Sequence, residues 1–480
     1  MITFLSAIVL LILGYFIYGK VIERLFGCDP KRVTPAFTKQ DGVDYIPMKP
    51  WRIFMIQFLN IAGLGPIFGA IMGAKFGTAS FLWIVFGSIF AGAVHDYLSG
   101  MMSLRKDGAS LPEIHGEYLG SGVKQFMRGF MIVLMVLVGV VFMVGPAALL
   151  AKLTPDSLNT VFWIVVIIIY YLLATLLPID KIIGKIYPVF GFCLLFMAVS
   201  ILGALLWYHP ALPEVWQGLQ NKHPNGDPIF PMMFVSIACG AISGFHATQS
   251  PMMARCMTNE KQGRPIFFGA MITEGVVALI WAAAASYFFF DTESGRTFFQ
   301  SGTDAAQVVD AITKSWLGTV GAILALLGVI FAPITSGDTA FRSARLIIAD
   351  FLNLDQKPIS KRLLIAIPLF VAAFFILLFS IYNKNGFAII WYYFAWANQT
   401  LAVFTLWAIT VYLSREAKNY WVTLVPALFM TMVCTTFIVM DVLSKLSITN
   451  PIPAYTVGVI VCVGALWFFI RKKAVKKLLE

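Results

Sequence analysis

Long apolar stretches, each separated from the next by a short polar segment, recur along the whole of this 480-residue chain. Most run for about 20 residues, the length of an α-helix that crosses a bilayer, whereas the strands of a membrane barrel are about half as long and alternate in polarity. Only 12% of the residues are charged, against about 25% in a typical soluble chain. We therefore expect an all-α polytopic membrane protein.

Thirteen transmembrane spans fit these stretches. Their predicted ranges are 3–26, 53–75, 80–104, 127–151, 160–178, 185–208, 230–256, 266–290, 318–342, 363–383, 388–413, 420–442 and 453–471. Because no long polar domain separates them, we expect a single membrane domain with loops. Its predicted parts are an extra N-terminal span with a cytoplasmic loop (1–52), a five-span unit (53–208), a second five-span unit (230–413), and two extra spans with a basic tail (420–480).

The basic residues indicate the orientation, because cytoplasmic loops of membrane proteins are enriched in Lys and Arg. An N-terminus outside the cell leaves 28 of the 35 Lys and Arg residues on the inner side. We therefore expect a cytoplasmic C-terminus and, in a bacterial-type cell, a place in the inner membrane. We attribute the net charge of +11 to topology and anionic lipid; no nucleic acid is expected, since no basic patch is interleaved with aromatic residues.

Other sequence signals are weak. Lys20 and Arg24 follow the first span instead of preceding it, so this span is expected to be a retained anchor and not a cleaved signal peptide. The six cysteines show neither CxxC nor zinc-type spacing, which predicts no metal site and no disulfide framework.

Two spans contain glycine-rich interruptions near their centres. The first runs from Ile61 to Gly69, and the second from Ala238 to Ala247. Glycine and proline weaken a helix, and in lipid the freed N–H and C=O groups need partners from protein, water or a bound solute. The alternative is a packing face, because small residues let membrane helices approach closely.

The two interruptions lie five spans apart, in segments of opposite orientation. A small residue followed by proline lies two spans after each interruption: Gly145-Pro146 after the first and Ala332-Pro333 after the second. We therefore predict two inverted five-helix repeats, as in the leucine-transporter-like fold. Paired broken helices in such repeats indicate the central site of a transporter.

The first interruption also predicts what the site binds. A half-helix that begins near Gly65 presents free N–H groups and the positive end of its dipole, which suits a carboxylate. The carbonyl groups that end the preceding half, around Asn60, Ile61 and Ala62, suit a cation.

Ionisable side chains inside membrane spans are costly and usually functional. His95 and Asp96 lie toward the inner end of their span and form either a proton relay or a structural pair. Glu274 has no countercharge nearby in the sequence, so it is either a proton carrier or a neutral, hydrogen-bonded glutamate. His246, directly after the second interruption, either touches the solute or bonds to loosened backbone.

Hydroxyl and amide side chains complete the candidates. Thr335 and Ser336, beside Asp338, offer oxygen ligands of the kind that hard cations such as Na⁺ prefer, although hydroxyls can equally bond to their own helix. Asn398 and Gln399 either line the solute path or join helices by hydrogen bonds.

These candidates fall into two groups. The residues expected to contact the solute are Gly63, Gly65, Pro66, Gly240, Ser243, Gly244, His246, Asn398 and Gln399. The residues expected to bind the coupling ion or proton are Ala62, His95, Asp96, Glu274, Thr335, Ser336 and Asp338. No catalytic or metal-binding residue is predicted, and no cofactor beyond a bound Na⁺ or a transported proton.

Several segments together resemble the carbon starvation protein A (CstA) family of bacterial inner-membrane transporters. They are 41–45 (DGVDY), 61–66 (IAGLGP), 92–96 (GAVHD), 105–110 (RKDGAS), 238–247 (ACGAISGFHA) and 397–399 (ANQ). The resemblance implies peptide uptake or proton-driven pyruvate import, and an amino acid–polyamine–cation-type core. The chain differs from the larger members, which carry a histidine pair where it has Ile56 and Gln57, and a glutamine where it has His95.

The sequence thus predicts a secondary active transporter that imports a small carboxylate-bearing nutrient, either a pyruvate-like acid or a short peptide, with H⁺ or Na⁺. An amino acid or another small solute is the alternative substrate. A channel or a nutrient sensor is the alternative of a different class. An enzyme is not expected, since neither HExxH nor GxSxG nor an ATP-binding P-loop occurs. The expected partners are the small-molecule substrate and the lipid bilayer; the sequence leaves the oligomeric state open.

Overall fold

The structure is a computed structural model that describes residues 1–176, 183–300, 305–383 and 385–479. All regular secondary structure in these ranges is helical. Ten helices of the described part are long and apolar enough to cross a membrane, and up to eleven if one sharply bent pair counts as a span. The chain is therefore a multi-pass membrane protein, as the apolar stretches predicted.

The helices follow one another along the chain with short connections, and η denotes short 3-10 or π turns. The first part contains α1 (Ile2–Leu13), η1 (Gly14–Tyr18), α2 (Gly19–Phe26), α3 (Pro35–Thr38), α4 (Pro50–Ile61), η2 (Gly65–Gly69), α5 (Ala70–Ala74), α6 (Ala79–Gly87), η3 (Ser88–Gly92), α7 (Ala93–Arg105), α8 (Leu111–Leu119) and α9 (Ser121–Leu153). The middle part contains α10 (Thr160–Leu176), α11 (Ile183–Tyr208), η4 (Val215–Gln217), η5 (Ile229–Met233), α12 (Phe234–Ser236), α13 (Gly244–Ala254), η6 (Glu260–Gln262), η7 (Arg264–Phe268), α14 (Gly269–Asp291) and α15 (Glu293–Gln300). The last part contains α16 (Ala305–Leu352), α17 (Ile359–Tyr382), α18 (Gly386–Arg415), α19 (Trp421–Lys445) and α20 (Ile452–Leu479).

Each of the thirteen predicted residue ranges contains helix in the structure. Three of these spans do not pass as single long apolar helices: α4 to α5 is bent, α10 is short, and η5 to α13 is interrupted. The count of thirteen crossings therefore stays a prediction.

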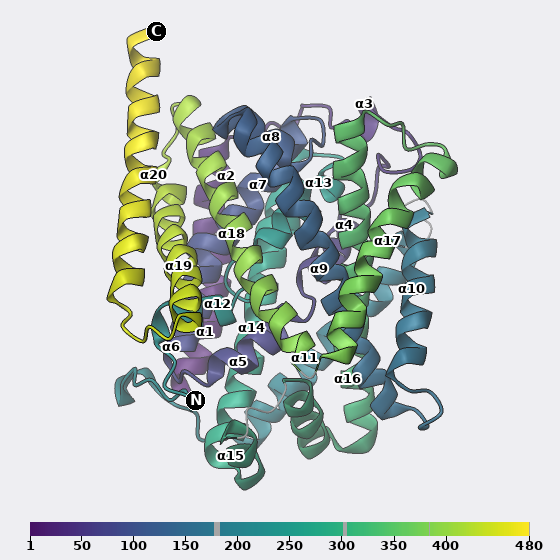
Figure 1. The fold of residues 1–480 in the computed structure, drawn as a ribbon, viewed down its shortest axis with the longest axis vertical. Coiled ribbons are helices and arrows are strands. Elements are labelled where there is room, and N and C mark those ends of the chain that lie inside the picture. The colour runs from purple at the N-terminus through teal and green to yellow at the C-terminus, as the bar shows by residue number, and fades with distance from the viewer. Residues whose placement is uncertain (177–182, 301–304, 384, 480) are drawn as a thin grey trace.

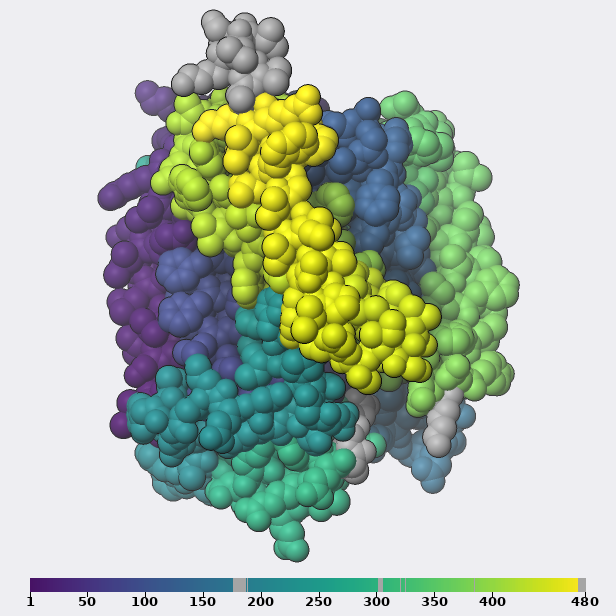
Figure 2. Space-filling model, turned by 60° about the vertical axis from the view of Figure 1, so that its left-hand side comes forward, coloured from purple at the N-terminus to yellow at the C-terminus, as the bar shows by residue number. Residues whose placement is uncertain are grey.

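The helices differ in how much of their apolar surface other helices cover. The most apolar windows of the α6–α7 and η6–α14 segments are each 83% buried, whereas that of α20 is 17% buried and that of the first segment 28%. Apolar surface that protein leaves uncovered suits contact with lipid tails. Accordingly, α20 lies on the outside of the bundle, against α19 (Figure 2).

The two ends of the chain lie at opposite ends of the molecule (Figure 1). The C-terminus of α20 shares one end with α3 and α8, which we call the α8 face, and the opposite end, with α15 and the N-terminus, is the α15 face. Between them, α9 packs along α16, and α13 packs against α4, α7 and α18. The interrupted helix thus lies at the centre of the bundle.

Candidate functional site at the broken helices

Both predicted interruptions are present in the structure. The helix α4 ends at Ile61, Ala62 leaves the helical conformation with φ −82° and ψ 45°, and the chain resumes at Gly65 with its axis turned by 51°. The second interruption is longer, because α12 ends at Ser236 and α13 begins only at Gly244. Each break leaves backbone groups that cannot bond within a continuous helix.

The two breaks lie against each other. A methyl group added to Gly65 would overlap the side chain of Cys239, so only glycine permits this approach. Gly240 lies beside Pro66, and its carbonyl accepts a 3.0 Å hydrogen bond from the Ser88 hydroxyl. The structure therefore brings together glycines that are about 175 residues apart in the sequence, as the prediction of one shared site requires.

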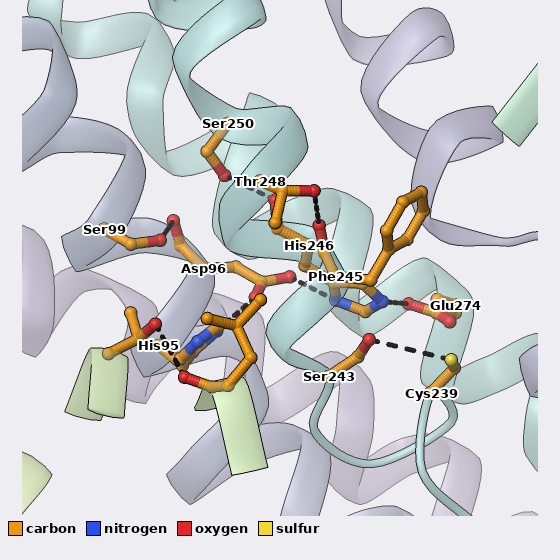
Figure 3. A network of polar contacts seen from close by, with 12 residues as sticks. His95, Asp96, Ser99, Cys239, Ser243, Phe245, His246, Thr248, Ser250 and Glu274 are labelled. Carbon is orange, nitrogen blue, oxygen red and sulfur yellow. Dashed lines mark hydrogen bonds and ion pairs between the residues drawn. The ribbon is translucent and has the colours of Figure 1, made fainter. Parts of the chain in front are cut away.

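A histidine in the first turn of α13 connects three helices (Figure 3). The Nδ1 atom of His246 lies 2.8 Å from Oδ2 of Asp96 on α7, and its Nε2 atom lies 3.3 Å from Oε2 of Glu274 on α14. The other oxygen of Asp96 lies 2.7 Å from Nδ1 of His95. Four ionisable groups thus form one chain, ordered His95, Asp96, His246 and Glu274.

These four side chains are fully buried, with 0% of each exposed. The contact between His246 and Glu274 has ion-pair distance but not hydrogen-bond geometry, so both carboxylate oxygens of Glu274 lack a hydrogen-bond partner among the described residues. A buried carboxylate in this position is costly when ionised unless a cation or a donor joins it. A proton on Glu274 or on His246 meets that need, which makes this pair suited to proton binding.

Asn398 of α18 fixes the start of α13. Its Oδ1 atom accepts a 2.6 Å hydrogen bond from the N–H of Phe245, and its amide also bonds the Ser243 hydroxyl, with Nδ2 at 2.9 Å. Gly244 lies so close to α18 that an added methyl group would overlap the Asn398 carbonyl. The neighbouring Gln399 donates a 2.6 Å hydrogen bond to the carbonyl of Phe234 on α12. Both amides therefore join helices by hydrogen bonds, which the sequence analysis gave as the alternative to lining the solute path.

A second polar cluster lies where α16 meets the end of α4. The Ser336 hydroxyl is 3.0 Å from the carbonyl of Leu59, and Thr339 donates to Oδ1 of Asn60 at 3.2 Å. Thr335 and Ser336 also bond the carbonyl of Ala332 in their own helix. Of the two predicted hydroxyls, Ser336 contacts the end of α4 and also bonds its own helix, whereas the Thr335 hydroxyl bonds only its own helix in the described contacts.

Asp338 points away from this cluster, because 3.6 residues per helical turn place it about 160° around α16 from Ser336. Its Oδ2 atom accepts a 2.8 Å hydrogen bond from the Tyr187 hydroxyl, which also bonds the Thr335 carbonyl at 2.9 Å. The other oxygen, Oδ1, has no hydrogen-bond partner among the described residues. The Leu59 carbonyl and the Ser336 hydroxyl therefore offer oxygen ligands of the type that a hard cation requires, and Asp338 does not join them.

Apart from Asp338, the predicted residues therefore fall into two clusters, with two differences from expectation. His95 and Asp96 were expected near the inner end of their span, but they lie well before its end at Arg105 and face the second break. The carbonyl that meets the Ser336 hydroxyl belongs to Leu59 instead of Ala62, because Ala62 already lies in the bend. Gly63 lies between the clusters, against Ser336 and Phe142.

The sequence did not predict Tyr187. Asn60 was expected to contribute its backbone carbonyl and Cys239 to lie in the second break, but the contacts of their side chains were not predicted. Tyr187 gave no signal, because its partner Asp338 lies 151 residues away. In the ranges that the structure describes, no group of three His, Cys, Asp or Glu side chains is arranged to hold a metal ion.

Known proteins share both the sequence and the fold of this chain. The family described as carbon starvation protein CstA matches over residues 1–162, 147–322 and 302–438. A membrane protein of Haemophilus influenzae is 44% identical over 63% of this chain and 95% of its own length. The peptide transporter CstA of Campylobacter jejuni is 25% identical over 88% of this chain and 78% of its own.

A second named transporter and a solved structure also match. The pyruvate/proton symporter BtsT of Escherichia coli is 27% identical over 65% of this chain and 54% of its own length. Among solved structures, a manganese transporter from Eremococcus coleocola superposes with a TM-score of 0.56 and 12% identity, over 92% of this chain and 98% of that chain. At that identity the match shows a shared fold alone. The relatives from Campylobacter jejuni and Escherichia coli are named as transporters.

Proposed function

Because the chain belongs to the carbon starvation protein CstA family, we propose that this membrane transporter imports a small carboxylate-bearing nutrient by coupling it to an ion gradient. A pyruvate-like acid and a short peptide are the candidate substrates, in line with the names of the relatives. The observation that carries the proposal is the contact of His246 with both Asp96 and Glu274 at the second break.

The central site consists of the two breaks. The N–H groups that begin the half-helices at Gly65 and Gly244 are the donors for the solute's carboxylate, since a helix N-terminus carries positive partial charge. Ser243 and Asn398 hold the second of these half-helices in place. Gln399 holds α12 on the other side of the break.

Protons are the coupling ion that the first cluster supports. A proton that enters on Glu274 can pass to His246, whose other ring nitrogen contacts Asp96. Each transfer changes the charge beside the helix that contacts the solute, so proton and solute binding are coupled through α13.

Na⁺ is the second candidate ion, and the cluster on α16 favours it. Its ligands would come from the Leu59 carbonyl and the Ser336 hydroxyl. Coupling to H⁺ makes uptake depend on a proton gradient and coupling to Na⁺ makes it depend on a sodium gradient, so an uptake experiment distinguishes the two ions.

We also infer the arrangement in the membrane. The chain would form two inverted five-helix repeats of the amino acid–polyamine–cation type, over 53–208 and 230–413, with further spans before and after them. The α8 face would be cytoplasmic, because the Lys and Arg residues concentrate at the α8 face. The N-terminus, at the opposite end, would be external. Rocking of one repeat against the other would then open the site to each side in turn.

Uptake into proteoliposomes tests the proposal. Purified protein is reconstituted, and radiolabelled pyruvate, dialanine and alanine are supplied under a proton gradient, a sodium gradient or neither. We expect accumulation of pyruvate or dialanine under one gradient only. The same assay is run on the variant Glu274→Gln, which removes the candidate proton-binding carboxylate. The variant Glu293→Gln, which changes an exposed carboxylate on α15, is its matched control. Failure of all three solutes to accumulate under either gradient would refute the proposal.

A further inference from the structure

The turn at residues 41–45 takes no part in the site described above. Oδ1 of Asp41 accepts three backbone N–H bonds, from Val43, Asp44 and Tyr45, at 2.8, 2.9 and 2.9 Å. These bonds fix the turn so that the next carboxylate, on Asp44, points into the protein, where the residue is only 5% exposed. The turn therefore presents one buried negative charge from a loop that precedes the first broken helix.

That carboxylate meets two buried arginines of α16. Oδ1 of Asp44 lies 3.3 Å from Nη1 of Arg342 and 3.8 Å from Nη2 of Arg345. The two arginines are 1% and 0% exposed, and Arg255, at the end of α13, is 5% exposed and adds its charge to the same region. Asp44 thus faces three guanidinium groups, while Asp338 lies near Arg342 and Asp350 lies near Arg255.

Arg345 has N–H groups that make no hydrogen bond. Its Nη1 atom donates to Gln356, but its Nε and Nη2 atoms have no hydrogen-bond partner in the part of the chain that the structure describes. A guanidinium binds a carboxylate best through two parallel N–H···O bonds. Asp44, at 3.8 Å from a single nitrogen, does not make that pair of bonds.

The arginines lie between the central site and the α8 face. Arg342 and Arg345 follow Asp338 on α16 by one and two helical turns, and Ser343 between them donates a 3.2 Å hydrogen bond to the carbonyl of Thr248, two residues beyond His246. A narrow cavity lies there, lined by Thr248, Arg255 and Ser343 among others, with a volume of about 10 Å³. A volume of this size holds no more than one water, so this cavity has no room for a solute.

We propose that Arg342 and Arg345 form a second binding site for the carboxylate of the transported solute, and that Asp44 occupies this site while the path to the α8 face is closed. This proposal rests on the function proposed above. When the turn withdraws, Asp44 no longer contacts the two arginines, and the solute's carboxylate binds them in its place on the way between the central site and the α8 face. Because the solute and Asp44 compete, bound solute favours the open path.

Binding stoichiometry of purified protein tests this directly, with radiolabelled pyruvate as the probe. Wild type should bind one pyruvate per chain, Asp44→Asn two, and the double variant Asp44→Asn/Arg345→Gln one again. Asp355→Asn, an exposed carboxylate at the end of α16, should match wild type. If the central site takes no pyruvate, the series becomes zero, one and zero, which refutes the proposed substrate and still supports the second site.

Equal stoichiometry of wild type and Asp44→Asn would overturn the second site, as would two bound molecules in wild type. A second measurement covers the case in which Asp44→Asn does not fold. Hydrogen exchange of the amides of residues 43–45 in wild type should accelerate at least fivefold when pyruvate or dialanine saturates the protein, because competition by the solute raises the small fraction of chains in which Asp44 has left the arginines. The same protection with and without both solutes would contradict the proposal.

Discussion

Nε2 of His246 lies 3.3 Å from Oε2 of Glu274, and both side chains are fully buried at the start of a broken helix. No hydrogen bond stabilises a negative charge on Glu274, since both oxygens of that carboxylate lack a hydrogen-bond partner among the described residues. A single proton shared by the two groups lowers the energy of this arrangement. The geometry therefore makes proton binding and the position of α13 interdependent.

Replacement of His246 should remove the connection between Asp96 and Glu274. We expect His246→Ala to lower uptake by about 5- to 150-fold, the range of typical coupling free energies of 1–3 kcal/mol. Initial rates in proteoliposomes measure the effect. His209→Ala, on an exposed histidine of a loop, is the control and should transport normally. A variant at His246 that transports as wild type would remove this residue from the mechanism.

Bulk at the contact of the two breaks should stop transport. Leucine at Gly65 would overlap Cys239, and leucine at Gly244 would overlap the backbone of α18 at Asn398. Overpacking of this kind costs about 1–3 kcal/mol or more, and here it separates the half-helices. We expect Gly65→Leu and Gly244→Leu to insert in the membrane and to lose uptake.

Gly203→Leu on α11 is the control for these substitutions, because an added methyl group at Gly203 meets open space. It should keep wild-type uptake. Normal transport by both Gly65→Leu and Gly244→Leu would show that the breaks are not the solute site.

The cluster on α16 makes a prediction about sodium. If Na⁺ couples transport, Ser336→Ala should raise the Na⁺ concentration needed for half-maximal uptake about tenfold, equal to about 1.4 kcal/mol of lost binding. Thr313→Ala is the matched control, because that hydroxyl bonds only carbonyls of its own helix in the described contacts. A sodium dependence that is the same for wild type and Ser336→Ala would exclude the cluster as the coupling site.

Asp44 makes a prediction about stability and pH. Burial disfavours its charged form, but Arg345, Arg342 and Arg255 outweigh this effect and hold the pKa of Asp44 below its ordinary value. Because the folded-state pKa is depressed, the stabilisation is complete above the unfolded pKa of about 3.9 and is lost as the pH falls through the folded pKa. Asp44→Asn should cost about 3–5 kcal/mol at neutral pH.

Thermal unfolding of wild type and Asp44→Asn as a function of pH measures this difference. The gap between the two melting temperatures should stay constant above about pH 4 and shrink below it. A constant gap at all pH values would mean that the ion pairs to Arg342 and Arg345 do not stabilise the fold.

Local patterns in the sequence predict most of the fold. Runs of apolar residues locate the helices, because lipid forces every spanning segment to satisfy its own backbone. Glycine and proline indicate the first break and glycine alone the second, but α9 and α16 continue through Pro146 and Pro333, so these residues weaken a helix without always interrupting it. The number of crossings is harder to predict, since the bent pair around Gly65 and the short α10 depart from a regular span.

The site is less accessible to such reasoning. His95 and Asp96 are adjacent in the sequence, so their contact was predictable, whereas the partner of Glu274 is His246, 28 residues away on another helix. Asp44 and Arg342 are 298 residues apart. Contacts at such separations depend on how helices pack, which a single sequence does not encode in any local pattern.

Proton movement during solute uptake tests the central claim most directly. Vesicles containing a pH-sensitive dye receive pyruvate or dialanine with no imposed gradient, and the dye reports entry of protons with the solute. We predict acidification by wild type and by Glu293→Gln, and solute exchange without acidification by Glu274→Gln. Equal acidification by Glu274→Gln and wild type, or uptake by wild type with no proton entry, would contradict the account.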